Sequence, residues 1–284
     1  MSVSIHLEGL GPHRDPGELE AALLGAIRGL GRVVVAFSGG IDSTLVLAAA
    51  VRAVGAENCV GVIGVSPSLA ARELAGAIEI GREVGARVER LETHELEVEG
   101  YRLNGPDRCY FCKSELYTAL AAYLSAKGYT HVLDGTNADD RLELRPGHKA
   151  AQELGVRSLL RECGFGKADI RTLASRWGVR NWNKPASPCL SSRIPHYSEV
   201  TVDKLSAIEQ AEALLAGMGF EDFRVRHHGD VARIELRPGD WPALLKDGVR
   251  QDLTSKFRQL GFKHVSMDLD GLRPGGLSEA VKGV

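Results

Sequence analysis

The sequence predicts an α/β fold, in which a doubly wound parallel sheet is followed by a smaller α+β domain. Two observations carry this prediction. Between residues 16 and 134, short and continuously apolar segments alternate with longer segments whose apolar residues recur at helical spacing. After Pro195 the pattern changes to a helix followed by two short strands. We therefore expect one domain at 1–194 and a second domain at 195–284.

The first domain opens with a helix predicted over residues 16–30, which has Pro16 at its start and apolar residues at helical spacing. Residues 33–37 form a continuous apolar run, which is typical of a parallel strand covered on both faces. The remaining elements alternate: a helix at 44–54, a strand at 59–65, a helix at 69–84, a strand at 87–91, a helix at 113–127 and a strand at 131–134.

Beyond residue 138 the chain is less regular, and one helix is predicted at 167–177. The elements predicted for the second domain are a helix at 199–217, strands at 223–228 and 231–236, and a helix at 241–260. The length of this region lies in the ordinary range for a small α+β domain.

The composition excludes several classes of protein. The 284 residues include 35 basic and 37 acidic ones, a net charge of −2, which argues against a nucleic-acid partner. The N-terminal sequence lacks a basic start followed by an apolar run, and the apolar segments are too short to cross a membrane. We therefore expect a cytoplasmic protein with no membrane partner. The chain has five cysteines, which is an odd number, and the cytosol is reducing. For both reasons a disulfide framework is not expected.

A phosphate-binding loop is predicted between the strand at 33–37 and the helix at 44–54, where the sequence reads SGGIDS. Glycines allow a tight turn that presents backbone amides, and the start of the next helix adds oriented N–H groups. The alternative is an ordinary turn with an Asp or Ser cap. The full pattern favours ATP contacts, with Mg²⁺ near the aspartate. The residues concerned are Ser38, Gly39, Gly40, Asp42 and Ser43.

A second polar segment, DGTNADD at 134–140, follows the last predicted strand of the first domain. Ligands of open α/β sheets bind at the carboxyl ends of the strands, so Gly135 and Thr136 are expected to contact the nucleotide. For Asp139 and Asp140 a helix-capping role is an equally good interpretation.

Three cysteines form the second candidate site. Cys109 and Cys112 make a CxxC at the start of a predicted helix, and Cys189 lies in SPCLSSR. A CxxC alone is compatible with half of a zinc site or with a redox pair. Three cysteines can instead hold three irons of a [4Fe-4S] cluster, which leaves one iron open for sulfide or substrate. Neighbouring cations are expected to favour the thiolates: Arg108, Lys113 and Arg193.

Several motifs occur in one order along the chain: SGGIDS, RCYFCK, GTNADD, LRPG, GVRSLL, KPASPCLSSRIP, FRVRHHGDVARIEL and VSMDLDGLRPGG. The first resembles the signature of the PP-loop ATP pyrophosphatases, which cleave ATP to AMP and pyrophosphate. Together the motifs resemble the LarE family of sulfur transferases, over about residues 16–280.

The resemblance implies an ATP- and Mg²⁺-dependent enzyme of nickel-pincer cofactor synthesis, the cofactor of lactate racemase. ATP would adenylate a carboxylate of pyridinium-3,5-biscarboxylic acid mononucleotide, and sulfur would then displace AMP to leave a thiocarboxylate. Members with the CxxC look like cluster enzymes, in which a [4Fe-4S] cluster relays sulfide from an external donor. Single-cysteine members sacrifice the sulfur of the cysteine in the position of Cys189. Here the CxxC favours the cluster type, and the resemblance also implies a homo-oligomer.

A pair of arginines is the candidate site for the substrate's phosphate. Arg224 and Arg226 alternate with apolar residues, so both guanidiniums would lie on one face of a strand. The alternative is a solvated strand face or an ion pair with Glu235 on the neighbouring strand. The family resemblance favours phosphate binding, with Arg193 beside Cys189 as a third contact.

Three rival functions stay open. A PP-loop tRNA thiolase also combines ATP with a CxxC and a further cysteine, but the chain lacks a basic, aromatic-rich segment for RNA. An NAD-synthetase-type ligase that uses ammonia has no need of three cysteines. A nucleotide-binding regulatory module would bind AMP without turning ATP over.

Overall fold

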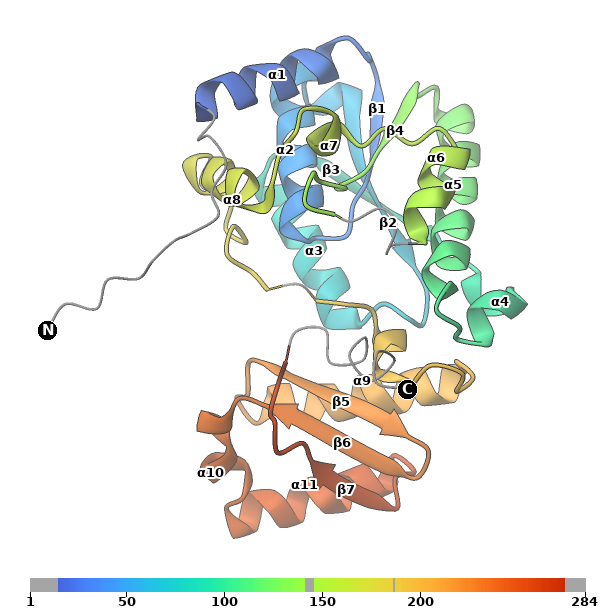
Figure 1. Ribbon diagram of the computed structural model, residues 1–284, viewed down its shortest axis with the longest axis vertical. Coiled ribbons are helices and arrows are strands. Elements are labelled where there is room, and N and C mark those ends of the chain that lie inside the picture. The colour runs from blue at the N-terminus through green and yellow to red at the C-terminus, as the bar shows by residue number, and fades with distance from the viewer. Residues whose placement is uncertain (1–14, 141–145, 186, 274–284) are drawn as a thin grey trace, which may run out of the picture.

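A computed structural model describes residues 15–140, 146–185 and 187–273. Figure 1 shows two parts, each with its own sheet. The first has a larger sheet flanked by helices, and the second has a smaller sheet formed by the C-terminal part of the chain. Parts of three sequence motifs lie outside the described residues: Leu144 and Arg145 of LRPG, Ala186 of KPASPCLSSRIP, and 274–276 of VSMDLDGLRPGG.

The larger sheet is parallel throughout, with the strand order β3-β2-β1-β4. The central strand β1 pairs with both β2 and β4, and Val34 faces Val60 on one side and Val132 on the other. The predicted doubly wound α/β fold is therefore confirmed. The strands are β1 (Val33–Ala36), β2 (Cys59–Val65), β3 (Arg87–Glu92) and β4 (His131–Leu133).

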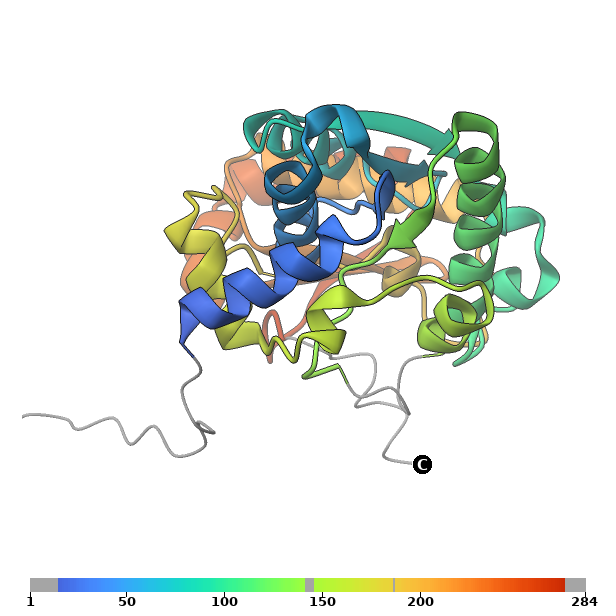
Figure 2. The same cartoon turned by 90° about the horizontal axis from the view of Figure 1, so that it is seen from above.

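Helices cover both faces of this sheet, as Figures 1 and 2 show. Alternate residues of a strand point to opposite faces. Val33 and Val35 accordingly pack among helices of one face, and Val34 packs among helices of the other. The first face carries α1 (Pro16–Arg28), α2 (Ile41–Val54), α3 (Ala71–Glu83), α7 (Leu159–Glu162) and α8 (Lys167–Arg176), and the second carries α5 (Arg108–Lys127) and α6 (Gly147–Glu153).

The chain changes from one face to the other between β1 and β4. It leaves β1 through α2 on the first face, and it enters β4 from α5 on the second. In open α/β sheets the crevice beyond the carboxyl ends of two such strands is the usual place for a ligand. Short connecting helices complete this part: η1 (Ala56–Asn58), η2 (Glu95–Glu97), α4 (Glu99–Arg102) and η4 (Leu190–Arg193).

The smaller sheet has the order β5-β6-β7, with an antiparallel hairpin of β5 and β6 and a parallel pairing of β6 with β7. The prediction of a single helix at 241–260 is wrong. Two helices occur there, because the backbone of Lys246 (φ −55°, ψ 136°) leaves the helical conformation, and Lys246 is the N-cap of the second helix. The elements are α9 (Val202–Gly217), β5 (Phe223–His228), β6 (Val231–Leu236), η5 (Pro238–Asp240), α10 (Trp241–Leu244), α11 (Asp247–Gln259) and β7 (His264–Met267).

Helix α9 joins the two parts. Leu205 and Ile208 pack with Tyr101, Leu190 and Ile194, whereas residues further along the helix belong to the core of the small sheet. The residues that follow Cys189, η4, therefore pack between the two sheets. Within the described residues, no helix is long and apolar enough to cross a membrane.

Candidate active site

The loop after β1 is held in shape by its own serines. The Ser43 hydroxyl donates to the Gly40 carbonyl at 3.1 Å, and it accepts from the backbone N–H of Ser38 at 3.2 Å. Gly39 has a φ of +71°, and a Cβ built on it would lie 2.6 Å from the Cβ of Ala77 on α3. Both its conformation and its packing therefore require glycine. The N-terminus of α2 directly follows this loop, so its free N–H groups face whatever the loop binds.

The segment after β4 lies against this loop. A Cβ built on Gly135 would lie 2.7 Å from the backbone nitrogen of Ser43, so only glycine permits the approach. The buried Asp134 carboxylate accepts hydrogen bonds from the hydroxyl of Thr136 at 2.8 Å and from that of Ser158 at 2.8 Å. Asp134 is thus committed to fixing the loop, which places Gly135 and Thr136 beside the PP-loop.

These two loops line one pocket of about 570 Å³, a volume in the range of small-molecule sites. It opens at the carboxyl ends of β1 and β4, where the change of face predicts a ligand. Of the predicted site residues, the pocket brings together Ser38, Gly40, Asp42, Ser43, Gly135, Thr136 and Cys109. Further lining comes from Arg108, Lys113, His148, Ser192 and His196.

Lys167 is a functional candidate that the sequence reasoning missed. Its ammonium forms an ion pair with the Asp42 carboxylate at the PP-loop. Asp139 holds the start of α8 in place, because its carboxylate accepts from the Lys167 backbone N–H at 2.6 Å. The prediction that Asp139 caps a helix thus agrees with this contact, which also positions Lys167.

Asp42 is a carboxylate at the pocket wall. Mg²⁺ in ATP sites is bound by one or two carboxylates besides the phosphates, so Asp42 is a suitable ligand for the ion.

The two cysteines of the CxxC have different surroundings. Cys109 is exposed and lines the pocket, whereas Cys112, one turn further along α5, is partly buried. Burial raises the pKa of Cys112 to about 12, and the charges of Glu95 and Cys189 raise it further, against an opposing effect of Lys113. The expectation that neighbouring cations favour a thiolate is therefore wrong for Cys112.

Besides this burial, two of the three expected cations are engaged elsewhere. The Arg108 guanidinium donates to the Asn104 side chain at 2.5 Å and to the Ser191 carbonyl at 2.9 Å. Arg193 is buried and forms an ion pair with Glu212 at 3.0 Å. Both arginines thus hold the Cys189 segment in place and leave the thiols without a facing cation from these positions.

The three thiols are neighbours but do not form a closed set of ligands. The charges of Cys109 and Cys189 both act on Cys112, which places the three side chains in one region. In the part of the chain that the structure describes, however, no three His, Cys, Asp or Glu side chains are gathered closely enough to hold a metal ion. The thiols as they lie therefore form no site for a single metal ion, whereas a [4Fe-4S] cluster binds each thiolate through a different iron and does not need them to converge on one point.

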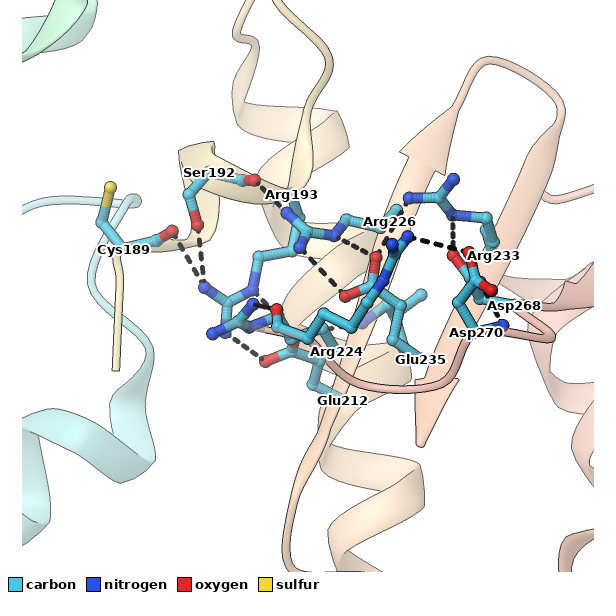
Figure 3. A network of polar contacts seen from close by, with 12 residues as sticks. Cys189, Ser192, Arg193, Glu212, Arg224, Arg226, Arg233, Glu235, Asp268 and Asp270 are labelled. Atoms are coloured by element: carbon cyan, nitrogen blue, oxygen red, sulfur yellow. Dashed lines mark hydrogen bonds and ion pairs between the residues drawn. The ribbon is translucent and has the colours of Figure 1, made fainter. Parts of the chain in front are cut away.

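A network of arginines and carboxylates holds the Cys189 segment from the side of the small domain (Figure 3). Arg193 donates to the carbonyl of Pro188 at 2.6 Å and to that of Cys189 at 3.2 Å. Arg226 donates to the Ser192 carbonyl at 2.7 Å. The Cys189 sulfur points away from this network in Figure 3.

The two arginines of β5 differ in their partners. Arg226 is buried and forms a two-pronged ion pair with Glu235 at 2.8 and 2.9 Å, which is the pairing left open as the alternative. Arg224 donates to the Arg273 carbonyl at 3.1 Å, and burial, followed by the charges of Arg226 and Arg193, lowers its pKa. Arg224 therefore lies where positive charge is in excess.

The charge balance of this network favours an anion. A dense group of like charges is stable when a counter-charge is supplied, and guanidiniums bind phosphate with two parallel hydrogen bonds. Within the described residues, six guanidiniums meet four carboxylates: Arg72, Arg193, Arg224, Arg226, Arg233 and Arg273 against Glu212, Glu235, Asp268 and Asp270.

Comparison with known proteins agrees with this geometry. A model of the NAD synthase family matches residues 26–99, which include the PP-loop. The pyridinium-3,5-bisthiocarboxylic acid mononucleotide synthase of Lactiplantibacillus plantarum is 40% identical over 265 residues, 92% of this chain and 94% of that protein. The chain belongs to the LarE family of PP-loop, ATP-dependent sulfurtransferases.

Two further relatives are uncharacterised proteins. One, from Synechocystis sp., is 40% identical over 89% of this chain and 94% of its own length. The other, from Methanocaldococcus jannaschii, is 28% identical over 84% of this chain and 90% of its own length. The similarity thus extends across both sheets, well beyond the PP-loop.

Proposed function

We propose that this enzyme converts carboxylates of pyridinium-3,5-biscarboxylic acid mononucleotide to thiocarboxylates, for nickel-pincer cofactor synthesis, through an adenylated intermediate. The observation that carries the proposal is the pocket that joins the PP-loop to Cys109 and to Ser192 of the Cys189 segment. A nucleotide and a sulfur-bearing side chain can meet there. The product named for the Lactiplantibacillus relative supplies the substrate class.

The first step is adenylation. A carboxylate oxygen of the substrate attacks the α-phosphorus of ATP, and the bond to the β-phosphate breaks, so that pyrophosphate leaves with the electron pair. The PP-loop amides and the start of α2 would stabilise the departing phosphates. Lys167 would move from Asp42 to the pyrophosphate, and Asp42 would hold Mg²⁺, which supplies charge neutralisation.

The second step is sulfur transfer. A thiolate attacks the acyl carbon, a C–S bond forms, and AMP leaves with the electrons of the C–O bond. If the sulfur is that of Cys189, cleavage of its Cβ–S bond with loss of the Cα proton leaves dehydroalanine and the thiocarboxylate. If the sulfur is external sulfide, its attack gives the thiocarboxylate directly, and Cys189 is unchanged.

The substrate's phosphate would bind at the arginine network, with Arg224, Arg226 and Arg193 as the candidate contacts. The Cys189 segment is bonded to this network through the carbonyls of Cys189 and Ser192. A phosphate held there would place the substrate's pyridinium ring on the side of the segment that faces the pocket.

We further expect the protein to be a cytoplasmic homo-oligomer without a nucleic-acid partner.

The test combines the purified protein with ATP, Mg²⁺ and the pyridinium mononucleotide. Pyrophosphate release and a thiocarboxylate product detected by mass spectrometry are expected together. Pyrophosphate release with tRNA and not with the mononucleotide would replace the proposal by tRNA thiolation. If neither pyrophosphate nor a thiocarboxylate or thiolated product formed with the mononucleotide or with tRNA, the proposal would be refuted.

Arg224→Ala is expected to raise KM for the mononucleotide by roughly tenfold or more, because one charge-assisted phosphate contact is lost. KM for ATP and the melting temperature should change little, since the Arg224 side chain is half-buried and faces no carboxylate in the described ion pairs. Arg258→Ala, at an exposed arginine of α11, is the matched control. An unchanged KM for the mononucleotide would place its phosphate elsewhere.

For the cluster, we propose Cys109, Cys112 and Cys189 as the iron ligands, with bound sulfide as the chemistry that a cluster would supply. Anaerobic reconstitution of the full chain should give about four irons and four sulfides per chain. Cys109→Ala should lose most of that iron, and Cys163→Ala should retain it. Full iron content in Cys109→Ala, or none in the native chain, would contradict the assignment and favour Cys189 as the sacrificial donor.

A further inference from the structure

A buried carboxylate, Glu95, is linked to the Cys189 segment through Ser68. The Glu95 side chain is 2% exposed, and its Oε1 accepts from the hydroxyls of Ser66 at 2.5 Å and Ser68 at 2.8 Å. Among the ion pairs of the described residues, Glu95 has no cationic partner. Burying a carboxylate with hydroxyl partners alone is costly, so this arrangement calls for a purpose beyond stability.

Two buried contacts lead from this region to the segment. The Leu190 backbone N–H donates to the Ser68 carbonyl at 2.9 Å, and the Tyr101 hydroxyl lies 2.5 Å from the Ser191 hydroxyl. Tyr101 and Ser191 are 1% and 0% exposed. Burial raises the pKa of Tyr101, so its hydroxyl stays protonated and can donate. Ser68, whose hydroxyl Glu95 holds, and Tyr101 thus contact neighbouring residues of the segment.

Glu95 fixes the first of these contacts. A carboxylate only accepts, so the Ser68 hydroxyl gives its proton to Glu95 and the Ser68 side chain is held in one orientation. The backbone of Ser68, whose carbonyl accepts from Leu190, is thereby anchored as well.

Leu190 and Ser191 directly follow Cys189, so the two contacts hold the residues next to the thiol. The arginine network also holds the segment, through Arg193 and Arg226.

We propose that Glu95 and Tyr101 are positioning residues for sulfur transfer, which hold the Cys189 segment in register with the acyl adenylate through the contacts Glu95–Ser68–Leu190 and Tyr101–Ser191. The inference rests on the proposed function above and assigns these two residues a role in its second step alone. The PP-loop, Gly135 and Lys167 make no hydrogen bond with Glu95, Ser68, Tyr101 or Ser191 among the described residues, so we expect adenylation to proceed without these contacts.

Tyr101→Phe tests the proposal, because it removes one hydroxyl and keeps the buried ring. Thiocarboxylate formation in a single turnover should fall about tenfold, the effect of a lost buried hydrogen bond, while pyrophosphate release stays within about twofold of the native rate. Glu95→Gln should give a smaller loss in the same direction, because the amide retains an acceptor but also offers donors to the serines. Tyr123→Phe is the matched control, since its hydroxyl bonds Glu89 at 2.7 Å away from the cysteines.

Equal losses of both products in Tyr101→Phe, together with a lowered melting temperature, would show a structural role and overturn the proposal. Unchanged thiocarboxylate formation would overturn it as well. Failure of the proposed function is distinct from either outcome, because the native chain itself would then release no pyrophosphate with the mononucleotide.

Discussion

Cys189→Ser is expected to abolish thiocarboxylate formation, by more than roughly a thousandfold, while pyrophosphate release continues. A serine hydroxyl is a far weaker nucleophile than a thiolate, and it has no sulfur to give. The cysteine is exposed, and the segment is bonded through its backbone carbonyl, so serine should leave the fold intact. Single-turnover assays that follow pyrophosphate and thiocarboxylate in the same sample would measure the two steps separately.

Cys163→Ser is the control for this prediction, because Cys163 is a partly buried thiol at the end of α7 and is absent from the pocket lining. It should behave like the native chain in both steps. Thiocarboxylate formed by Cys189→Ser at a native rate would contradict a role of Cys189 as donor or ligand. The intact mass of the native chain after one turnover then separates the two mechanisms, since sacrifice of Cys189 removes the elements of hydrogen sulfide and external sulfide leaves the mass unchanged.

Strands were predictable where local pattern alone decides them. The strand at 59–65 and the hairpin strands at 223–228 and 231–236 occur with the predicted bounds. The first is a continuous apolar run, and the hairpin strands are separated by Gly229 and Asp230, with φ +61° at the glycine. At these sites the apolar pattern and the turn residues both predict the same strand bounds, so the bounds can be predicted from sequence alone.

Helix boundaries depended on contacts that a sequence pattern does not contain. The helix predicted at 113–127 begins at Arg108, so both cysteines of the CxxC lie within its first turns. Gly147 begins α6, where no helix was predicted, and a Cβ on it would lie 2.9 Å from the Lys113 side chain. In both places contacts between α5 and neighbouring segments accompany helical structure that the local pattern did not predict.

The site was predictable to the extent that it is built from contiguous motifs. The PP-loop and DGT segments meet because parallel strands end at one edge of the sheet. Lys167 and Glu95 could not be found in this way, because their partners lie far away in sequence and only the tertiary fold brings them together. A buried acidic residue is also invisible to a polarity pattern, which assigns Glu95 to the surface.

Gly39→Ala is expected to reduce pyrophosphate release by roughly a hundredfold, the scale of a misplacement of reacting groups by about an ångström. Alanine at φ +71° is strained, and its Cβ would overlap the Cβ of Ala77 at 2.6 Å and the Cα of Ala77 at 2.9 Å. Because the obstructing atoms belong to a helix rather than to a flexible side chain, the loop must give way. The PP-loop amides then turn away from the phosphates, and KM for ATP should rise as well.

Gly76→Ala separates this effect from a general disturbance of α3. Gly76 is the neighbour of Ala77 on the same helix, and a Cβ built on it has no atom within 4 Å. Alanine is a better helix former than glycine, so this variant should be as stable as the native chain or more stable by about 0.5–1 kcal/mol, with unchanged pyrophosphate release. If Gly39→Ala released pyrophosphate at the rate of Gly76→Ala, the loop would tolerate a side chain that its geometry excludes, and the phosphates would have to bind away from it.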